Sequence, residues 1–570
     1  MSRKLRDLGG WSLALASIVL INVAAAALFV RLDLTEDQRF TLNPATRRLL
    51  EGLDRTVYVE VYLEGEFPAG FGRLRQAIRE KLDEFRVWSG SNFQYAFVDP
   101  AAATNAADRA EYYQQLAERG IQPTRLFDNE GGKRTEKIIF PGALVQSGDQ
   151  EQPIIFLRGD QRSANLSPAQ RLNRAVEGVE YELASAVKRA TQTRRRKVGL
   201  IRGHGELGDY ETFGLFTALR PYYEVERVDL PNVVNLEGYD AVIVAKPDTA
   251  FSEPDKFKLD QFVINGGRAM FLLDAMRIDI ERIGPEGAMA FPIELNLLDL
   301  LFKWGVRVNG DLVQDLQAAS IPMFVGYVGD QPQTQPLPWW YFPLTNTFAE
   351  HPITKNLDAV YLRFAGTIDT VRAAGITKTP LMFTSRYSRI RPAPVRVNFN
   401  EARLEPQPQQ FNAGPQPVAY LLEGTFRSLY TNRLAPKTEE MFEFRAQNLP
   451  SKVLVISDGD VVRNDLGRDS SAFPLGFDRV SQLTFANQDL ILNALEYMLD
   501  EDGVVLARNK EIELRPLDVA RLQEERLRWQ LLNVVGPLVL LVLFGVGRYA
   551  WRKRKYERLR PAATGTAHGA

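Results

Sequence analysis

The chain has 570 residues, and its 70 lysines and arginines nearly balance its 71 aspartates and glutamates. A length of this order suits about two to four domains, and a net charge near zero gives no electrostatic reason to expect a nucleic-acid partner. The sequence contains no cysteine, which excludes disulfides, thiolate catalysis and cysteine-ligated zinc or iron–sulfur clusters.

Two uncharged, apolar runs lie near the ends of the chain. The first has twenty residues, Trp11–Val30, and the second has seventeen, Gln530–Val546. At about 1.5 Å rise per residue, each run approaches the thickness of a bilayer core. We therefore predict transmembrane helices within residues 1–32 and 529–550. A cleaved signal peptide is the alternative for the first run, which is longer than the usual apolar segment of such a peptide.

Basic residues lie on the terminal side of both runs. They are Arg3, Lys4 and Arg6 before the first run, and Arg548, Arg552, Lys553, Arg554 and Lys555 after the second. Because basic flanks stay in the cytoplasm, we predict a two-pass protein with both termini cytoplasmic. Residues 551–570 would then be a basic cytoplasmic tail, residues 506–528 a stalk helix, and the bulk of the chain extracytoplasmic.

The segment 33–192 predicts a first α/β domain. In chain order we expect a helix Pro44–Gly52 capped by Asn43, strand Val57–Leu63, helix Phe71–Trp88, strand Phe93–Val98, helix Ala106–Arg119, strands Glu136–Gln146 and Gln152–Leu157, and helix Pro168–Arg189. This order of strands and helices is that of a thioredoxin-like fold. The redox motif C-x-x-C is missing, so no redox chemistry is expected.

A second α/β domain is predicted over residues 193–505, after the basic linker Thr191–Lys197. We expect a strand beginning at Lys197, helix Tyr210–Leu219, strands Tyr223–Asp229 and Asp240–Ala245, helix Pro254–Ile264, strand Arg268–Leu273, strands Val418–Glu423 and Lys452–Ser457, and helix Asn487–Leu499. Alternation of strands and helices indicates a parallel, doubly wound sheet.

A large insertion, at about 284–417, interrupts this pattern. The aromatic run Trp339–Phe342 would be costly to leave in water, so we expect order there, with the run in a core or a subdomain seam. The polar, proline-rich stretch Asn398–Pro417 is expected to form an exposed loop.

Four residues are candidates for a ligand-facing loop: His204, Glu206, Asp458 and Asp460. His204 and Glu206 follow the strand that starts at Lys197, and open α/β sheets bind ligands at the carboxyl ends of such strands. No partner nucleophile is apparent, however, and the favoured interpretation is a histidine that orders the loop. The other two histidines lie in an apparent loop, His351, and in the tail, His568.

Asp458 and Asp460 could offer oxygen ligands to Mg²⁺ or Ca²⁺. The sequence Asp-Gly-Asp is also ordinary turn chemistry, which we favour. The sequence contains no H-E-x-x-H, G-x-S-x-G, Walker A or G-x-G-x-x-G motif. We therefore expect no catalytic residue, no bound metal and no cofactor.

Several stretches together resemble one family of proteins. They are DLTEDQRFTLNPATRRLL, VYLEGEFPAGFGRLRQAIREKLDEF, GHGE, PVAYLLEGTF, ISDGD, NQDLILNALEYMLDEDGVVLARNKEIELRPLD and WQLLNVVGPLVLLVLFGV with its basic tail. In these stretches the chain is similar to the GldG-like auxiliary components of ABC transporters associated with bacterial gliding motility. The resemblance covers most of the chain and is weakest between Gly284 and Glu405.

The resemblance implies a non-catalytic subunit anchored in the bacterial inner (cytoplasmic) membrane. Such a subunit would work with an ABC permease and a cytoplasmic ATPase, and would bind a substrate, an envelope polymer or a protein outside the cytoplasm. The resemblance also implies a thioredoxin-like domain followed by a flavodoxin-like domain similar to class I amidotransferases, here without the cysteine nucleophile. Two alternatives stay open: a hydrolase-like enzyme that uses the loop of His204 and Glu206, and a structural envelope tether.

Overall fold

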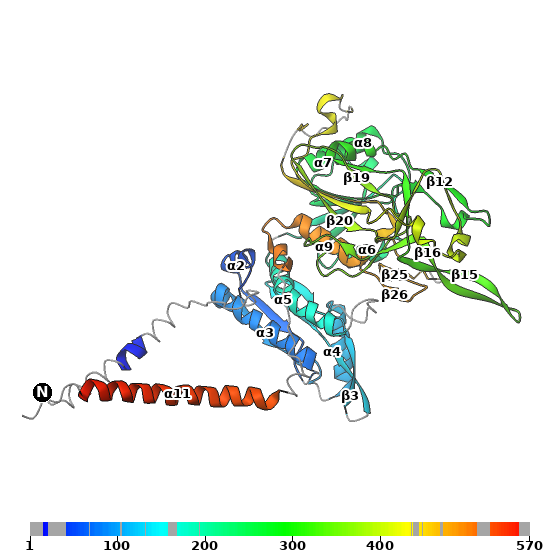
Figure 1. Cartoon of the computed structure of the whole chain (residues 1–570). Coiled ribbons are helices and arrows are strands. Elements are labelled where there is room, and N and C mark those ends of the chain that lie inside the picture. Colours follow the sequence, from blue (N-terminus) through cyan, green and yellow to red (C-terminus); the bar gives the residue numbers. More distant parts are fainter. Residues whose placement is uncertain are drawn as a thin grey trace, which may run out of the picture. The chain divides into compact units, whose positions relative to one another are not determined.

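The computed structural model describes residues 15–20, 41–65, 67, 69–102, 105–130, 133–157, 168–192, 194–434, 436, 444–446, 449–467, 471–509 and 525–557 (Figure 1). The chain divides into two compact units, Met1–Glu511 and Ile512–Ala570. Residues 15–20 of the first predicted span are helical. The rest of that span, His568 and most of the predicted tail and stalk lie outside the described residues.

The N-terminal part of the first unit is built on a four-stranded sheet in the order β2-β1-β5-β6. Its strands are β1 (Val57–Val61), β2 (Phe93–Phe97), β5 (Gly142–Ser147) and β6 (Gln150–Ile155). β1 is parallel to β2 and antiparallel to β5, which pairs antiparallel with β6. The accompanying helices are α2 (Pro44–Glu51), α3 (Ala69–Ser89), α4 (Ala106–Glu118) and α5 (Pro168–Thr191), with a 3₁₀ turn η1 (Gly90–Asn92).

Helix α3 packs on this sheet through one apolar stripe. Leu74, Ile78 and Leu82 recur every four residues and share a core with Val57 and Val59 of β1, as expected for an amphipathic helix. The start of α2 agrees with the sequence prediction, because Asn43 Oδ1 accepts a hydrogen bond from the backbone N–H of Ala45 at 2.9 Å. Such a cap satisfies one of the free N–H groups at a helix start.

The predicted strand Glu136–Gln146 was wrong as a single element. The structure divides it between β4 (Lys133–Ile139) and β5, with a tight turn in which Gly142 N donates to Phe140 O at 2.8 Å. Pro141 has no N–H for a ladder, which favours a break there. β4 instead forms a separate hairpin with β3 (Thr124–Glu130), a strand that the polar sequence did not predict.

The larger part of the first unit is built on an eight-stranded sheet in the order β17-β20-β23-β24-β10-β9-β7-β8. Its strands are β7 (Lys197–Arg202), β8 (Glu224–Asp229), β9 (Ala241–Ala245), β10 (Arg268–Leu272), β17 (Thr347–Phe348), β20 (Ile376–Phe383), β23 (Pro417–Gly424) and β24 (Ser451–Ile456). The five from β8 to β24 are parallel. From β24 to β17 each pair is antiparallel.

Helices cover both faces of this sheet. They are α6 (Phe213–Leu219), α7 (Glu253–Ile264), α8 (Leu298–Trp304) and α9 (Asn487–Leu499). Alternate residues of β9 belong to different cores: Val242 and Val244 pack with α7 and α8, whereas Ala241 and Ile243 pack with α6 and α9. Because both faces of β9 are buried, its sequence is a continuous apolar run.

The insertion consists mostly of short strands. They are β12 (Ala288–Pro292), β13 (Val306–Val308), β14 (Asp311–Asp315), β15 (Ala318–Val328), β16 (Gln331–Thr345), β18 (Val360–Tyr361), β19 (Ile368–Thr370), β21 (Ser388–Pro392) and β22 (Val395–Val397), and β11 (Met276–Arg277) precedes them. The same range also supplies β17 and β20 of the central sheet. β15 and β16 form a long antiparallel hairpin that extends from the body of this part (Figure 1). Trp339 and Tyr341 of β16 are fully buried, which confirms the expected order there.

The remaining connections are short. They include the 3₁₀ helices η2 (Leu230–Asn232), η3 (Ile280–Arg282), η4 (Phe399–Arg403), η5 (Pro408–Gln410), η6 (Leu429–Asn432), η7 (Asp460–Val462) and η8 (Val504–Asn509), and the strand pair β25 (Phe477–Asp478) and β26 (Leu483–Thr484). The predicted loop Asn398–Pro417 thus contains two 3₁₀ turns, and Phe411 within it is buried. Residues 506–509 were predicted as stalk but lie in η8, where Ala507 is 1% exposed.

Helix α5 joins the two parts of the first unit. Arg189 Nη1 lies 2.7 Å from Glu496 Oε1 on α9, and Lys188 Nζ lies 2.8 Å from Asp500 Oδ1. The second unit contains α11 (Arg526–Glu557), which includes the second predicted span. Among the described helices, the 30 residues Arg526–Lys555 alone are long and apolar enough to cross a membrane, by length and composition.

Candidate functional site

Four polar residues follow the carboxyl ends of parallel strands in the central sheet. His204 comes two residues after β7, Lys246 directly after β9, Asp274 two residues after β10, and Asp458 two residues after β24. We call this region the carboxyl edge. Open α/β sheets place ligands at such an edge. The carboxyl edge also holds the four residues that the sequence analysis named as candidates: His204, Glu206, Asp458 and Asp460.

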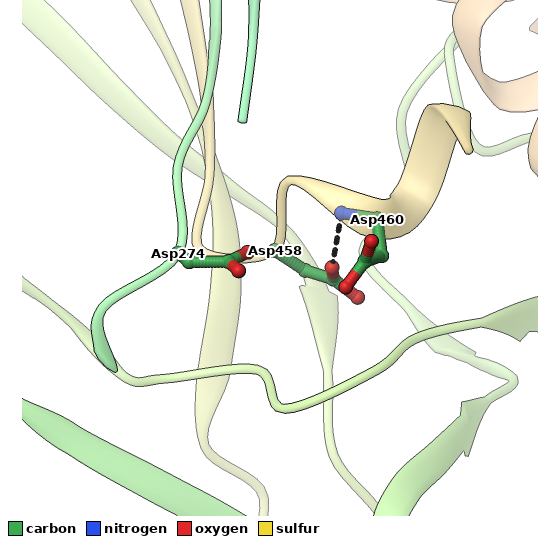
Figure 2. Close-up of side chains that lie close together, drawn as sticks. All are labelled: Asp274, Asp458 and Asp460. Carbon is green, nitrogen blue, oxygen red and sulfur yellow. Dashed lines mark hydrogen bonds between the residues drawn. The ribbon is translucent and has the colours of Figure 1, made fainter. Parts of the chain in front are cut away.

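Three aspartates form a buried cluster at this edge (Figure 2). Each of Asp274, Asp458 and Asp460 offers a carboxylate oxygen, and the three oxygens lie within 4.8 Å of one another. Asp458 Oδ1 accepts a hydrogen bond from the N–H of Asp460 at 2.7 Å, the turn contact expected of Asp-Gly-Asp. Asp458 Oδ2 accepts from Arg363 N at 2.6 Å, and Asp274 Oδ1 accepts from Gly459 N at 2.7 Å.

Lys246 places a positive charge among these carboxylates. Its Nζ lies 2.9 Å from Asp274 Oδ2 and also pairs with Asp460 Oδ2. Lys246 has φ 53°, a left-handed conformation that is uncommon for a residue with a side chain. Gly459 packs against it so closely that an added Cβ would lie 2.5 Å from Lys246 Cβ. Three unpaired carboxylates this close together would attract a metal ion. Here the ammonium group of Lys246 supplies the positive charge instead.

The environments of the three aspartates differ. Burial raises the pKa of Asp458, and the neighbouring Asp460 and Asp274 raise it further. Burial also raises the pKa of Asp274, although Lys246 opposes this. Burial acts in the same direction on Asp460, but Lys246 and Arg363 outweigh it and hold the pKa of that carboxyl below its usual value. Lys246 therefore favours the ionised form of Asp460, whereas burial and the neighbouring carboxylates disfavour the ionised form of Asp458.

His204 is enclosed in a separate cluster. Its Nε2 lies 3.2 Å from Asp255 Oδ2, its Nδ1 lies 3.6 Å from Glu206 Oε1, and its ring stacks on Phe251 with 3.8 Å between centroids. The side chain is only 4% exposed in relative terms. Burial lowers the pKa of His204, but hydrogen bonds with Asp255 and Glu206 outweigh it and raise the pKa to about 9. The imidazolium is therefore the form that this site holds.

The backbone around His204 fixes the ring in that place. Gly203 and Gly205 have φ of 119° and 73°, and a Cβ at Gly205 would lie 1.7 Å from Asp248 Oδ1. The carbonyl of His204 accepts hydrogen bonds from Asp248 N and Thr249 N, at 3.1 and 3.0 Å. Both glycines are thus required by the loop geometry, and the loop turns the histidine inward.

The two clusters share an edge but are not joined directly. Among the described residues, no hydrogen bond or ion pair links His204 or Glu206 to Asp458 or Asp460. Arg463 extends the aspartate cluster to Glu211, because its Nη2 lies 2.7 Å from Glu211 Oε1 and its Nη1 lies 3.4 Å from Asp460 Oδ1. The four candidates do not converge on one reacting atom, which general acid–base chemistry would require.

Sequence reasoning missed Lys246, Asp274, Asp255 and Arg363. Lys246 and Asp274 each follow a predicted apolar strand, so the rule that selected His204 would have found them. Asp255 is the third residue of α7, whose N-cap is Ser252, a spacing typical of a helix start. No local signal marks Arg363. The remaining described histidine, His351, is neutral, because burial and Lys452 lower its pKa to about 4.

Two family models match most of the chain. A model of the family described as "ABC-type uncharacterized transport system" matches residues 195–494, and a model of a domain of unknown function matches residues 36–146. An uncharacterized protein of Borreliella burgdorferi is 19% identical, with 97% of this chain and 100% of that protein covered.

Two solved structures are similar to parts of the chain. The mmIFT52 N-terminal domain is 13% identical, with 54% of this chain and 98% of that domain covered at a TM-score of 0.31. A putative ThuA-like protein from Parabacteroides merdae is also 13% identical, with 57% and 94% covered at a TM-score of 0.24.

Proposed function

Because the chain belongs to the family described as "ABC-type uncharacterized transport system", we propose that it is a membrane-anchored, non-catalytic auxiliary subunit of an ABC transporter. It would work with a separate permease and a separate cytoplasmic ATPase, in the manner of the GldG-like components that its sequence resembles. The observation that carries the proposal is the family match over residues 195–494, which spans the central sheet. The apolar helix α11 supports anchoring in a membrane.

The carboxyl edge supports a non-catalytic role. His204 is buried, its Nε2 is paired with Asp255 and its ring is stacked on Phe251, so the imidazole is enclosed rather than presented to a substrate. At the second cluster, Lys246 neutralises the carboxylates that a metal-dependent hydrolase would need. A binding role for the outer domains, toward a substrate, an envelope polymer or a protein, requires neither group to react.

The proposal includes a two-pass topology in the bacterial inner membrane. The apolar runs Trp11–Val30 and Gln530–Val546 and their basic flanks support it. It also includes the two folds that the resemblance implies. The order β2-β1-β5-β6 with one parallel pair supports a thioredoxin-like first domain, and the helices on both faces of five parallel strands support an amidotransferase-like second domain.

The test is co-purification of the intact complex. The full-length chain, tagged and expressed in its own host, is extracted in a mild detergent and its partners are identified by mass spectrometry. We expect a multi-span permease and an ATPase with a Walker A motif, both absent when an unrelated membrane protein carries the same tag. Recovery of envelope proteins without any ATPase would contradict the transporter role and favour a structural tether.

The hydrolase-like alternative has its own test. Glu206→Gln and Asp458→Asn change the proton-transfer groups with little change in shape. If the protein acts by binding, both variants should assemble with the permease and ATPase and sustain transport at the wild-type level. A variant that assembles normally yet abolishes transport would contradict a role in which neither group is needed.

A further inference from the structure

A cavity of about 260 Å³ opens at the opposite edge of the central sheet. Its walls include the residues at which three parallel strands begin: Arg196 before β7, Asp240 before β9, and Arg268 at the start of β10. Gly266 and Gly267 of the turn after α7 form another wall, and Glu501 lies at the cavity as well. The proposed transport role makes no use of this edge.

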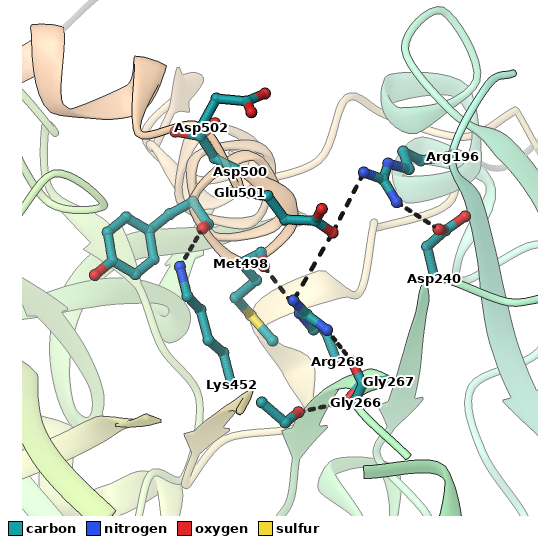
Figure 3. Close-up of polar contacts among 12 residues, drawn as sticks. Arg196, Asp240, Gly266, Gly267, Arg268, Lys452, Met498, Asp500, Glu501 and Asp502 are labelled. Atoms are coloured by element: carbon teal, nitrogen blue, oxygen red, sulfur yellow. Dashed lines mark hydrogen bonds and ion pairs between the residues drawn. The ribbon is translucent and has the colours of Figure 1, made fainter. Parts of the chain in front are cut away.

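Two arginines in this cavity converge on one carboxylate (Figure 3). Arg196 Nη2 lies 3.4 Å from Glu501 Oε1, and Arg268 Nη2 lies 4.0 Å from the same oxygen. Both distances are long for charge-assisted hydrogen bonds, which are about 2.7–2.9 Å. Glu501 is therefore held loosely, and its side chain is 59% exposed, against 19% for Arg268.

The guanidinium groups themselves are held firmly. Arg268 Nε donates to Met498 O at 3.2 Å, and its Nη1 donates to Gly266 O. Arg196 Nη1 donates to Asp240 Oδ1 at 2.9 Å. In each arginine these contacts leave Nη2 directed at the position of the Glu501 carboxylate. Two fixed donors that face one point are preorganised for an anion.

The charged residues that line the cavity are two basic ones, Arg196 and Arg268, and three acidic ones, Glu237, Asp240 and Glu501. Arg194 and Arg195 precede Arg196 in the basic linker, and Arg194 Nη2 lies 3.1 Å from both oxygens of Asp240. Burial lowers the pKa of Arg268, Glu501 and Asp240 raise it, and the like charge of Arg196 lowers it. The two guanidiniums therefore repel each other, and Glu501 offsets part of that repulsion. A dianion with several acceptor oxygens relieves this repulsion better than one carboxylate oxygen.

The side chain of Glu501 can move out of the cavity without a change in the backbone of its segment. Its neighbour Asp500 pairs with Lys188 at 2.8 Å and accepts from Val505 N at 2.8 Å, while Asp502 pairs with Lys188 at 2.6 Å. The segment thus stays anchored to α5 when the Glu501 side chain turns outward. An exposed ion pair of this kind contributes little to stability.

We propose that this cavity is a binding site for a phosphate group, which Arg196 and Arg268 hold in the place that Glu501 occupies. The phosphate belongs either to a small soluble compound or to a lipid headgroup. Glu501 competes with the ligand and sets its affinity. The site is independent of the transporter role, because it rests on the geometry of this cavity alone.

The test uses the full-length chain in phospholipid-free detergent, titrated with inorganic phosphate at constant ionic strength and followed by calorimetry. We expect saturable binding by the wild type. Arg268→Gln should weaken it about tenfold or more, since a charged hydrogen bond is lost. Glu501→Gln should tighten it about threefold, since a like charge is removed. Opposite shifts of two variants in one cavity cannot come from impaired folding.

The matched control is Arg282→Gln, since the Arg282 side chain is 86% exposed and pairs only locally with Asp279. This variant should bind phosphate as the wild type does. Phosphate binding that phosphatidic acid nanodiscs do not compete identifies a soluble compound as the source. Competition by nanodiscs that contain phosphatidic acid, but not by phosphatidylcholine nanodiscs, identifies a headgroup. The proposal is overturned if neither the wild type nor Glu501→Gln binds phosphate in either setting, or if Arg268→Gln binds it unchanged.

Discussion

At the scale of single residues, Lys246 determines what the aspartate cluster can do. Its ammonium group neutralises Asp274 and Asp460, which are buried. Lys246→Met would remove the lysine counter-ion of both carboxylates, and removal of one member of a buried pair costs about 3–5 kcal/mol. We expect the free energy of unfolding, measured by denaturant titration in detergent, to fall by that amount.

The control for this prediction is Lys197→Met. Lys197 also pairs with carboxylates on a neighbouring strand, but near the surface, where such pairs contribute about 1 kcal/mol or less. Adding Asp460→Asn to Lys246→Met should restore part of the lost stability, because it removes one of the carboxylate charges that have lost their lysine counter-ion. Equal stability of Lys246→Met and Lys197→Met would contradict a buried counter-ion role.

His204 gives the second prediction at this scale. Its pKa is about 9 in the folded chain, against about 6.5 for a free histidine. The raised pKa stabilises the fold fully below about pH 6.5, and this stabilisation is lost as the pH rises through 9. The stability difference between wild type and His204→Gln should therefore shrink by about 3 kcal/mol between those two pH values. A difference that is constant from pH 6 to 10 would show that the histidine is neutral.

The sequence predicted the histidine loop and the Asp-Gly-Asp turn because both signals are local. Glycines beside His204 and between the aspartates mark turns without any knowledge of the fold. Lys246 and Asp274 gain their role only when β9, β10 and β24 lie side by side. Gly459 and Asp274, which share a hydrogen bond, are 185 residues apart in the chain. Such a contact has no signature in a single sequence.

At the scale of elements, the hairpin β15–β16 differs sharply along its length. Trp339 of β16 is fully buried, and its ring packs against Phe342 and Phe399, each with 4.9 Å between centroids. Tyr327, near the tip of β15, is 68% exposed. The base of the hairpin is therefore part of the core, and the tip is not.

Substitutions at the two positions should separate these roles. Trp339→Ala removes a large buried ring, and such changes cost about 3–5 kcal/mol. Tyr327→Ala should stay within about 0.5 kcal/mol of the wild type, as is usual for exposed sites. Thermal unfolding of both variants in the same detergent measures the difference. A similar loss of stability for both would mean that the tip is packed as well.

The long helices and the apolar parallel strands could be predicted, because their periodicity is strong. Helix α9 begins and ends at the predicted residues, Asn487 and Leu499. The strands of the insertion could not be predicted. For example, β12 and β22 are short and pair with each other although they lie far apart in the chain. Nor did the apolar run of β23 reveal that it lies antiparallel to β24, because a strand's direction in a sheet is set by its connections.

At the scale of the whole molecule, the main prediction concerns topology. From the two apolar runs and their basic flanks we expect the residues between them to lie outside the cytoplasm. A reporter inserted at Asn412, an exposed position between η5 and β23, tests this directly. Alkaline phosphatase placed there should be active, whereas the same enzyme fused after residue 570 should be inactive. Activity of a cytoplasmic reporter at Asn412 would refute the two-pass arrangement.

The two outer strands of the central sheet have a consequence for self-association. An exposed strand edge can pair with another chain and start aggregation. Among the described strands, β17 forms one edge with only two residues, and β8 forms the other with the charged sequence EVERVD. A very short edge and a charged one both discourage such pairing. This sheet can therefore be concentrated at a membrane surface without offering a second copy a strand to extend.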